Sequence, residues 1–376
     1  MAVQLKTSEY RFYPENYGAL GNGVHDDLPA LQAAVDAADA IGGGTIVLGK
    51  STYNIYSGTW KIGRANTQHH INIEGVSPNL TIISCNTSAG SAAIYLNLEK
   101  YVILKGFSVV NQGPRGGYGI RFGGDNGPGM QTNGNLVQHI LFSNFQYGAF
   151  MSGGIGTASD IEFDHCIYNN NDYGFYSADF NSLDYLHIMP EMYGNGVGMF
   201  ISTGNMTVMH GTSNGNGNDF YIAGGNDGTV KIVGFRAEIP TGTWLIAKAN
   251  NYLSIEDCIV HPRELGVEVI NTLAGIRVVN TVLNGYITAH IFENSAIILD
   301  NVSVNMPGGD WSIGNQYSSA TPPFGPGFRM TNNIGFTPNS RVYIRSVFDT
   351  STNTMYPDIS GIAVARPDGM RAIIVS

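Results

Sequence analysis

The chain has 376 residues and a formal net charge of −10, and only 13% of its residues are charged. It contains 49 glycines, and 43% of its residues are hydrophobic, which supplies enough apolar material for a folded core. This composition excludes a disordered chain and a coiled coil, and the acidic balance opposes a general nucleic-acid-binding surface. No apolar run is long enough for a membrane-spanning helix, so we expect neither nucleic acid nor membrane as a partner.

The N-terminal segment, residues 1–18, has no apolar stretch of the kind found in secretion signals. The next segment predicts one short helix. Asp26 or Asp27 can N-cap it, Pro29 suits its first turn, and apolar residues then recur at helical spacing until three glycines at 42–44 end it. A β-branched segment, residues 45–55, follows and predicts a strand, and no further helix is indicated.

From residue 71 onward the chain repeats a strand-like unit of about 22 residues. Ten segments can be aligned, at 71–79, 102–110, 140–148, 161–169, 183–191, 206–214, 230–238, 253–261, 276–284 and 297–305. Positions 1 and 3 of each segment are mostly apolar, whereas position 5 is Gly, Asn, Asp or His. These four residue types tolerate left-handed backbone best, so we expect each segment to bend at position 5.

A second short strand follows most of these segments, as in residues 173–177, 198–202 and 219–223. Several short strands per repeat, with no helix between them, predict an all-β protein: a parallel β-solenoid of about ten or more rungs with a short N-terminal capping helix. A propeller is disfavoured because a unit of about 22 residues is too short for a four-stranded blade.

Residues 16–55 resemble the opening signature of the pectate-lyase-like superfamily of right-handed parallel β-helices, which includes phage tailspike depolymerases and polygalacturonases. The carrying residues are the turn Gly21-Asn22-Gly23 and the predicted helix after it. The resemblance implies a right-handed solenoid and a polysaccharide or oligosaccharide partner, and it favours a homotrimer. We expect no cofactor. The location is open from the sequence, with an extracellular or virion-associated one favoured. The catalytic motifs of polygalacturonases are absent, so none of that subfamily's catalytic residues is carried over.

We expect three parts: an N-terminal segment with the capping helix at 1–56, the parallel β-helix at 57–315, and a C-terminal cap or subunit-contact region at 316–376. The three cysteines, Cys85, Cys166 and Cys258, suit neither a disulfide framework nor a thiolate zinc site. We therefore expect them to fill the core.

Position 9 of the aligned segments forms an outward column that contains Glu191, Asn214 and Glu238. Stacked strands are about 4.8 Å apart, so two rungs would set Glu191 and Glu238 about 9–10 Å apart at their backbones. Inverting glycosidases separate their acid and base by about 6.5–9.5 Å. The pattern therefore predicts Glu191 and Glu238 as catalytic acid and base, with the alternative that both are ordinary solvated side chains.

Further residues are candidates for substrate binding near this column. Arg236 is expected beside Glu238, where it can hold a sugar acid or form a plain surface ion pair. The aromatic rings that are candidates for stacking on sugars are Tyr193, Trp244, Tyr221 and Tyr176. Asp219 and Asp172 are alternative carboxylates on adjoining turns, and Asn214 and His261 complete the predicted substrate-binding set.

His165, His187 and His210 all fall at position 5, which suggests three stacked imidazoles. Their place at the bend already explains them, and imidazoles repeating every rung converge poorly on a tetrahedral ion. We therefore expect no metal site there.

Three functional hypotheses remain open from the sequence. The first is a glycoside hydrolase that uses Glu191 and Glu238. The second is a β-eliminating lyase acting on a uronate, with Arg236 neutralising the sugar carboxylate and His261 or Tyr193 as the base. The third is a non-catalytic glycan-binding or tail protein.

Overall fold

The computed structural model describes the chain from residue 10 to residue 375 with gaps. The segments outside the description are 64–68, 98–99, 124–130, 152–156, 179–183, 203, 224–227, 239–240, 248–251, 262–264, 273–275, 284–285, 292–296, 301–302, 305–310, 316–327, 332–340, 346, 350–353, 357–362 and 365–370. Beyond residue 261, side chains are described only at 277–282 and 300. The expected C-terminal cap at 316–376 therefore lies largely outside the described residues, and its role stays a prediction.

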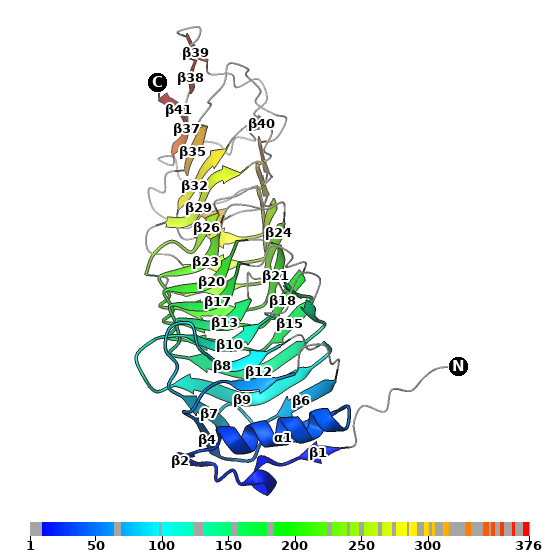
Figure 1. The fold of residues 1–376 in the computed structure, drawn as a ribbon. Helices are drawn as coiled ribbons and strands as arrows, with labels where there is room; N and C mark the ends of the chain where they lie inside the picture. Colours follow the sequence, from blue (N-terminus) through cyan, green and yellow to red (C-terminus); the bar gives the residue numbers. More distant parts are fainter. Residues whose placement is uncertain are drawn as a thin grey trace, which may run out of the picture. The chain divides into compact units, whose positions relative to one another are not determined.

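The chain forms two compact units, residues 1–199 and residues 200–376. Each unit consists almost entirely of parallel strands that coil into a β-solenoid, as the repeat predicted (Figure 1). Each turn carries strands on three faces, here called the first, second and third face in chain order.

In the N-terminal unit each face is a stack of hydrogen-bonded parallel strands. The first face consists of β1 (Arg11–Phe12), β3 (Gly43–Val47), β6 (His70–Glu74), β15 (Ile161–Asp164), β18 (Asp184–Ile188) and the first halves of β9 (Ile103–Asn111) and β12 (Leu136–Ser143). The second consists of β2 (Asn22–Asp26), β4 (Thr52–Ile55), β7 (Ile82–Cys85), the second halves of β9 and β12, β16 (Ile167–Asn169) and β19 (Glu191–Tyr193). The third consists of β5 (Trp60–Ile62), β8 (Ala92–Leu96), β10 (Tyr118–Phe122), β13 (Tyr147–Met151) and β17 (Tyr173–Ser177).

The C-terminal unit has the same three stacks. Its first face holds β21 (Asn205–Met209), β24 (Thr229–Val233), β27 (Tyr252–Glu256), β30 (Ile276–Val279), β33 (Ile297–Asp300), β36 (Phe328–Thr331) and β40 (Ala363–Val364). Its second holds β22 (Thr212–Asn214), β25 (Arg236–Ala237), β28 (Ile259–Val260), β31 (Val282–Leu283) and β34 (Ser303–Val304). Its third holds β23 (Asn218–Ile222), β26 (Leu245–Ala247), β29 (Leu265–Thr272), β32 (Tyr286–Ile291), β35 (Trp311–Asn315), β37 (Arg341–Arg345) and β41 (Arg371–Val375).

A few elements lie outside these stacks or at the unit boundary. The boundary falls within β20 (Val197–Ile201), β11 (Gln131–Asn133) pairs with β14 (Thr157–Ser159), and β38 (Val347–Asp349) pairs antiparallel with β39 (Thr354–Tyr356). Where side chains are described, the solenoid has about eight turns, so the expected ten or more was slightly too high.

The bend between the first and second faces is made by single residues with left-handed backbone. In the N-terminal unit these are Gly106, His139, His165 and Met189, with φ angles of 76°, 50°, 50° and 47°. In the C-terminal unit they are His210, Gly234, Asp257 and Asn280. The expected bends were correct at most rungs, but Met189 replaces His187 and His139 replaces Asn144 at this corner.

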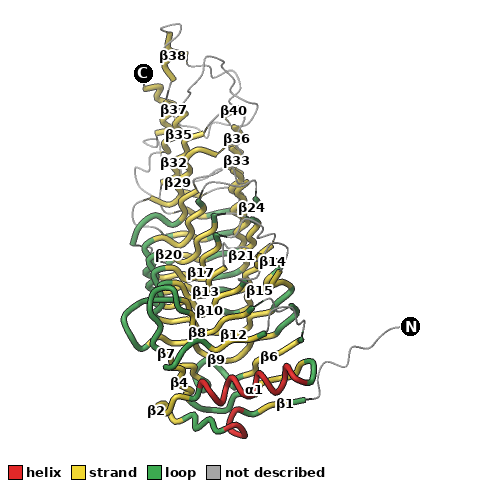
Figure 2. The backbone as a smooth tube through the Cα atoms, in the orientation of Figure 1, coloured by secondary structure: helices red, strands yellow, loops and turns green. Residues whose placement is uncertain are grey.

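The short helix is α1 (Leu28–Ala40), the only α-helix among the described residues, and it lies across the first strands of the N-terminal unit (Figure 2). A 3-10 turn, η1 (Pro14–Tyr17), precedes it. Leu31, Ala34 and Ala38 are fully buried beneath the helix, as the apolar spacing predicted. Neither α1 nor any other described helix meets the length and apolarity of a membrane span.

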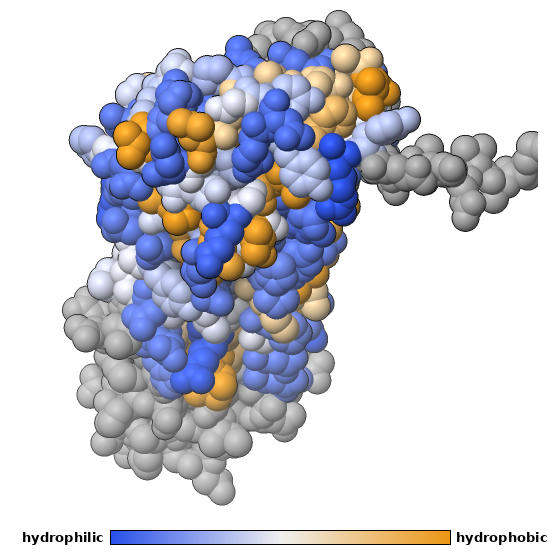
Figure 3. Space-filling view, turned by 90° about the horizontal axis from the view of Figure 1, so that it is seen from below, coloured by the Kyte–Doolittle hydropathy of each residue, from blue (hydrophilic) through white to orange (hydrophobic). Residues whose placement is uncertain are grey.

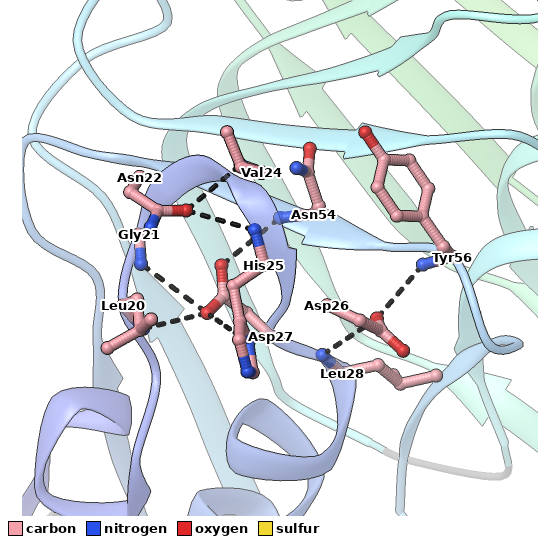
Figure 4. Close-up of polar contacts among 10 residues, drawn as sticks. All are labelled: Leu20, Gly21, Asn22, Val24, His25, Asp26, Asp27, Leu28, Asn54 and Tyr56. Carbon is pink, nitrogen blue, oxygen red and sulfur yellow. Dashed lines mark hydrogen bonds and ion pairs between the residues drawn. The ribbon is translucent and has the colours of Figure 1, made fainter.

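Asp27 occupies the N-cap position, but its carboxylate does not cap the helix. It is fully buried and accepts hydrogen bonds from the backbone N–H groups of Leu20, at 2.7 Å, and of Gly21 and Asn54 (Figure 4). A buried carboxylate is tolerated only when such donors surround it. Asp27 therefore ties the turn before β2, strand β4 and the start of α1 together.

α1 also covers the free edge of β5, the first strand of the third face. The Gln32 amide donates to the Lys61 carbonyl oxygen at 3.1 Å and accepts from the Lys61 backbone N–H at 3.0 Å. These two bonds reproduce what a neighbouring strand would offer, so this stretch of edge is satisfied without another strand.

The core of the N-terminal unit is strongly aromatic around β15 and β18. Phe163, Tyr168 and Phe175 are fully buried, and His187 lies among them without any exposed surface. Its ring stacks on Phe163 with a 4.8 Å centroid distance and a 9° angle between planes. The prediction that His187 stands at a corner beside His165 was therefore wrong.

The three cysteines were expected to fill the core. Cys85, Cys166 and Cys258 are free and buried, as predicted, and burial raises the pKa of each thiol to about 12. The thiols are therefore held in their neutral form and serve as packing groups.

On the surface seen in Figure 3, hydrophobic residues are interspersed with hydrophilic ones.

Candidate functional site

The register of β16 and β19 changes the column that contains Glu191. Glu191 lies opposite Ile167, whereas Tyr193 lies opposite Asn169. The ninth position in this rung is therefore taken by Tyr193, and the aligned segment must be moved by two residues. The argument that placed Glu191 in one column with Glu238 was wrong, because it rested on His187 rather than Met189 as the bend.

Glu191 and Tyr193 nevertheless form one polar pair on the outer side of the second face. The Tyr193 hydroxyl donates to Glu191 Oε2 at 2.8 Å, and both side chains are half-buried. β19 sets this contact because residues two apart in a strand point to the same side. The pair offers a carboxylate that is held in place by a phenol.

The C-terminal unit brings Asn214, Glu238 and Arg236 together. Ser213 lies opposite Ala237, so Asn214 and Glu238 are neighbours on adjacent rungs, and Asn214 Nδ2 lies 3.4 Å from Glu238 Oε2. Arg236 Nη2 lies 3.1 Å from Glu238 Oε1. The two charged side chains are 60% and 45% exposed, so water screens this ion pair strongly.

His261 extends the same column by one rung. Its backbone N–H donates to the carbonyl oxygen of Ala237, and its side chain is exposed. Asn214, Glu238 and His261 therefore stand on three successive rungs of the second face, as the alignment predicted.

Asp219 and Trp244 do not reach the outer surface, contrary to expectation. Trp244 is fully buried against Phe220 and Phe235, so no face of its ring is open to a sugar. Asp219 is also fully buried and accepts hydrogen bonds from Ser213 Oγ and, at 2.7 Å, from Asn216 Nδ2. Burial raises its pKa to about 6, although these two hydrogen bonds counteract the rise. Both residues serve the interior.

Glu191 belongs to the N-terminal unit and Glu238 to the C-terminal unit. Each carboxylate therefore has its own surroundings: Tyr193 beside Glu191, and Asn214 and Arg236 beside Glu238. Chemically, either group can donate or accept a proton at the outer surface of the second face.

The sequence argument missed an aromatic surface on the third face of the N-terminal unit. Tyr118, Tyr147 and Tyr173 stack on successive rungs, with centroid distances of 5.4 and 5.3 Å. Beside them Phe150 and Tyr176 stack at 5.5 Å. All five side chains are half-buried and lie on the outer side of β10, β13 and β17. These five residues are called the aromatic surface below.

A charged group borders the aromatic surface where the second face turns into the third. Arg115 Nη1 lies 3.3 Å from Asp172 Oδ1, and Arg115 Nη2 donates to Asn170 Oδ1. The loop that carries Arg115 is anchored by Asn144, whose amide donates to the carbonyl oxygens of Asn111 and Gly113 at 2.8 and 2.9 Å. A guanidinium, a carboxylate and an amide thus stand together at one edge.

Asp172 is close enough to the aromatic surface for its charge to affect the pKa of Tyr147. The pKa of Tyr147 is raised by burial first, and then by the nearby tyrosines and by Asp172. A signal for this surface was present in the sequence, because Tyr-Gly recurs at 118–119, 147–148 and 173–174. The sequence predicted Tyr176 as a sugar-stacking ring and Asp172 as an alternative carboxylate, but both beside the Glu191 column rather than on this surface.

Comparison with known proteins gives short sequence matches and a longer structural one. No protein family model matches the chain. Mannuronan C5-epimerase AlgE1 of Azotobacter vinelandii is 52% identical over 44 residues, which is 12% of this chain and 3% of the epimerase. A capsule KN3-specific depolymerase of Klebsiella phage KN3-1 is 50% identical over 50 residues, 13% of this chain and 6% of the depolymerase. The chain thus spans only a few per cent of the length of these curated relatives.

Among solved structures, the gp42 tailspike of Acinetobacter phage vb_AbaP_AS12 aligns with a TM-score of 0.51 and 12% identity. The alignment covers 96% of this chain and 66% of the tailspike. At this identity the likeness concerns the fold alone. It agrees with the β-helix architecture to which residues 16–55 pointed.

Proposed function

We propose that this protein acts on a polysaccharide and that the polymer is bound over the aromatic surface. The observation that carries the proposal is the row of stacked rings bordered by Arg115, Asp172 and Asn170. Carbohydrates present apolar C–H faces together with many hydroxyl groups, and binding sites for such ligands combine apolar rings with a few placed polar groups. The short matches to a polysaccharide epimerase and a capsule depolymerase support the same substrate class.

The reaction we propose is glycoside hydrolysis. Hydrolysis by this route needs one carboxyl that donates a proton and one carboxylate that acts as base or nucleophile. Glu191 and Glu238 remain the proposed residues, each now considered separately, and Asp172 joins them because it borders the aromatic surface.

The reaction is tested by incubating the full chain with neutral and acidic polysaccharides and weighing the fragments by mass spectrometry. Hydrolysis predicts fragments that each carry one added water. Fragments that lack this water and contain a new carbon–carbon double bond would indicate a lyase and overturn hydrolysis. A polymer that binds without any change would support the non-catalytic alternative.

Single variants then test the residues. The variants are Glu238→Gln, Glu191→Gln and Asp172→Asn. Each variant at a position that takes part in proton transfer should lower the rate by about 100-fold or more. Glu162→Gln is the matched control, because Glu162 is a half-buried carboxylate on the outer side of β15. If all three variants keep the rate of the control, the assignment is wrong.

A uronate polymer is a second candidate substrate, favoured by matches to six mannuronan C5-epimerases. In this case Arg236 would face the sugar carboxylate, and His261 or Tyr193 would exchange the proton. NMR spectra of mannuronan before and after incubation test it, since altered sugar stereochemistry without fragments would replace hydrolysis by epimerisation. Unaltered spectra would remove this candidate.

The expected homotrimer is part of the same proposal. Light scattering of the purified chain should give three times the mass of the 40.3 kDa monomer. A monomeric mass would contradict the homotrimer.

A further inference from the structure

The corner between the first and second faces of the N-terminal unit carries an unusual succession of side chains. Gln138 lies opposite Asp164, and Asp164 lies opposite Ile188. The residues that follow these three, His139, His165 and Met189, therefore occupy the same corner on successive rungs. All three are exposed, and all three have left-handed backbone.

The two imidazoles are in contact. Their ring centroids lie 4.9 Å apart, and the ring planes are inclined by 44°. Because the His139 side chain is exposed, its rotamer can adjust to bring one ring nitrogen onto an ion held by His165. Three stacked imidazoles were expected to converge poorly on a tetrahedral ion. This corner instead holds two imidazoles and a thioether.

A carboxylate orients the central imidazole. Asp164 Oδ1 lies 2.5 Å from His165 Nδ1, and Gln138 Nε2 donates to Asp164 Oδ2 at 2.7 Å. With Nδ1 engaged by the carboxylate, His165 keeps Nε2 for a ligand, an arrangement that fixes metal-binding histidines in many proteins.

The third side chain at this corner is a thioether. Met189 is 43% exposed, and its rung is about 4.8 Å from that of His165. Methionine is neither a usual surface residue nor suited to left-handed backbone, where Gly106 stands two rungs before His165. Corner geometry therefore does not explain this residue.

We propose that His139, His165 and Met189 bind a copper(I) ion at this exposed corner. Thioether sulfur favours copper(I), and imidazole nitrogen also suits copper, whereas magnesium and calcium prefer oxygen. Asp164 acts as the positioning residue for His165. The three groups belong to one compact unit, so the site does not depend on the C-terminal unit.

The test is a competition titration of the full chain with copper(I) and a coloured chelator, under anaerobic and reducing conditions. Wild type should take one copper(I) per chain from the chelator. His139→Ala and His165→Ala should each weaken binding at least tenfold, and Asp164→Asn by about tenfold through misorientation of His165. Zinc is titrated in parallel as a comparison metal, because its protein ligands are Cys, His and carboxylate rather than thioether. Met189→Leu should weaken copper(I) binding and leave the zinc titration unchanged.

Controls keep the outcome decisive. His70→Ala and His25→Ala remove exposed imidazoles elsewhere in the N-terminal unit and should leave the copper(I) affinity unchanged. Circular dichroism of each variant checks the fold. The proposal is overturned if wild type binds no more tightly than the His139→Ala/His165→Ala double variant, or if the control variants lose as much affinity as the corner variants. Equal effects of Met189→Leu on copper(I) and zinc would also overturn the role of the thioether.

Discussion

Two buried titratable residues, one in each unit, show how differently a solenoid core can treat a polar group. His187 in the N-terminal unit lies among Phe163, Phe175 and Tyr168, and neither ring nitrogen has a hydrogen-bond partner. Asp219 in the C-terminal unit is equally buried but receives hydrogen bonds from Ser213 and Asn216.

Burial favours the neutral form of both groups, with opposite consequences for pH dependence. It lowers the pKa of His187 from 6.5 to about 3 and raises that of Asp219 from 3.8 to about 6. Between the folded and unfolded pKa values of His187, the folded chain binds fewer protons at this residue than the unfolded chain does. Between the two pKa values of Asp219, the folded chain binds more protons there. The free energy of unfolding therefore falls at His187 as the pH decreases, and at Asp219 as the pH increases.

Replacing the unpartnered group should have the largest effect. His187→Leu removes two unsatisfied nitrogens and should raise the free energy of unfolding by about 1 kcal/mol at pH 7. At pH 5 we expect about 3 kcal/mol, since protonation of the unfolded wild type adds about 2 kcal/mol. Urea unfolding at both pH values measures this gain.

His70→Leu is the control for His187→Leu, because His70 is exposed. It should change the stability by less than about 0.5 kcal/mol at either pH. A gain for His187→Leu that does not grow between pH 7 and pH 5 would contradict the assigned titration.

Replacing the partnered group should give a smaller maximal gain in stability, and this gain should grow with increasing rather than decreasing pH. Asp219→Asn keeps an acceptor for Asn216 and should raise the free energy of unfolding by about 2 kcal/mol at pH 7, because it removes a buried charge. Near pH 4, where Asp219 is already protonated in the folded chain, the gain should vanish. Thermal unfolding at the two pH values distinguishes this result from a constant shift, which would break the comparison.

The smallest effect is expected for the exposed ion pair of the C-terminal unit. Arg236→Gln should change the free energy of unfolding by less than about 0.5 kcal/mol, since water screens the contact with Glu238. Urea unfolding at low and high salt checks this expectation. A larger, salt-dependent loss would show that exposed charges count as much as buried ones here.

Much of the architecture was open to sequence reasoning, because a fixed period with apolar positions leaves few alternatives. The helix, the parallel strands and most corners follow from spacing and from Gly, Asn and Asp at the bends. The failure at one corner has a clear physical origin. His187 satisfies the residue preference of a corner but lies in the core, while Met189, which lacks that preference, makes the bend.

That exchange also explains why Glu191 was assigned to the wrong position at the candidate site. A shift of two residues moved Glu191 away from the ninth position and placed Tyr193 there. The exposure of Trp244 and Asp219 was misjudged, because residues just before or at the start of a third-face strand can turn inward as readily as outward. The contact of Arg115 with Asp172, 57 positions along the chain, depends on stacking across rungs, which no local pattern reveals.

The hydrogen bonds between Gln32 of α1 and Lys61 of β5 prevent a further strand from pairing with this edge of the sheet. A second molecule that tried to add its own strand at Lys61 would have to break two existing hydrogen bonds before forming new ones. Gln32→Ala would remove both hydrogen bonds to the Lys61 backbone and so expose a sheet edge with which a second molecule can pair. The side-chain amide of Gln32 thus protects this face against end-to-end polymerisation.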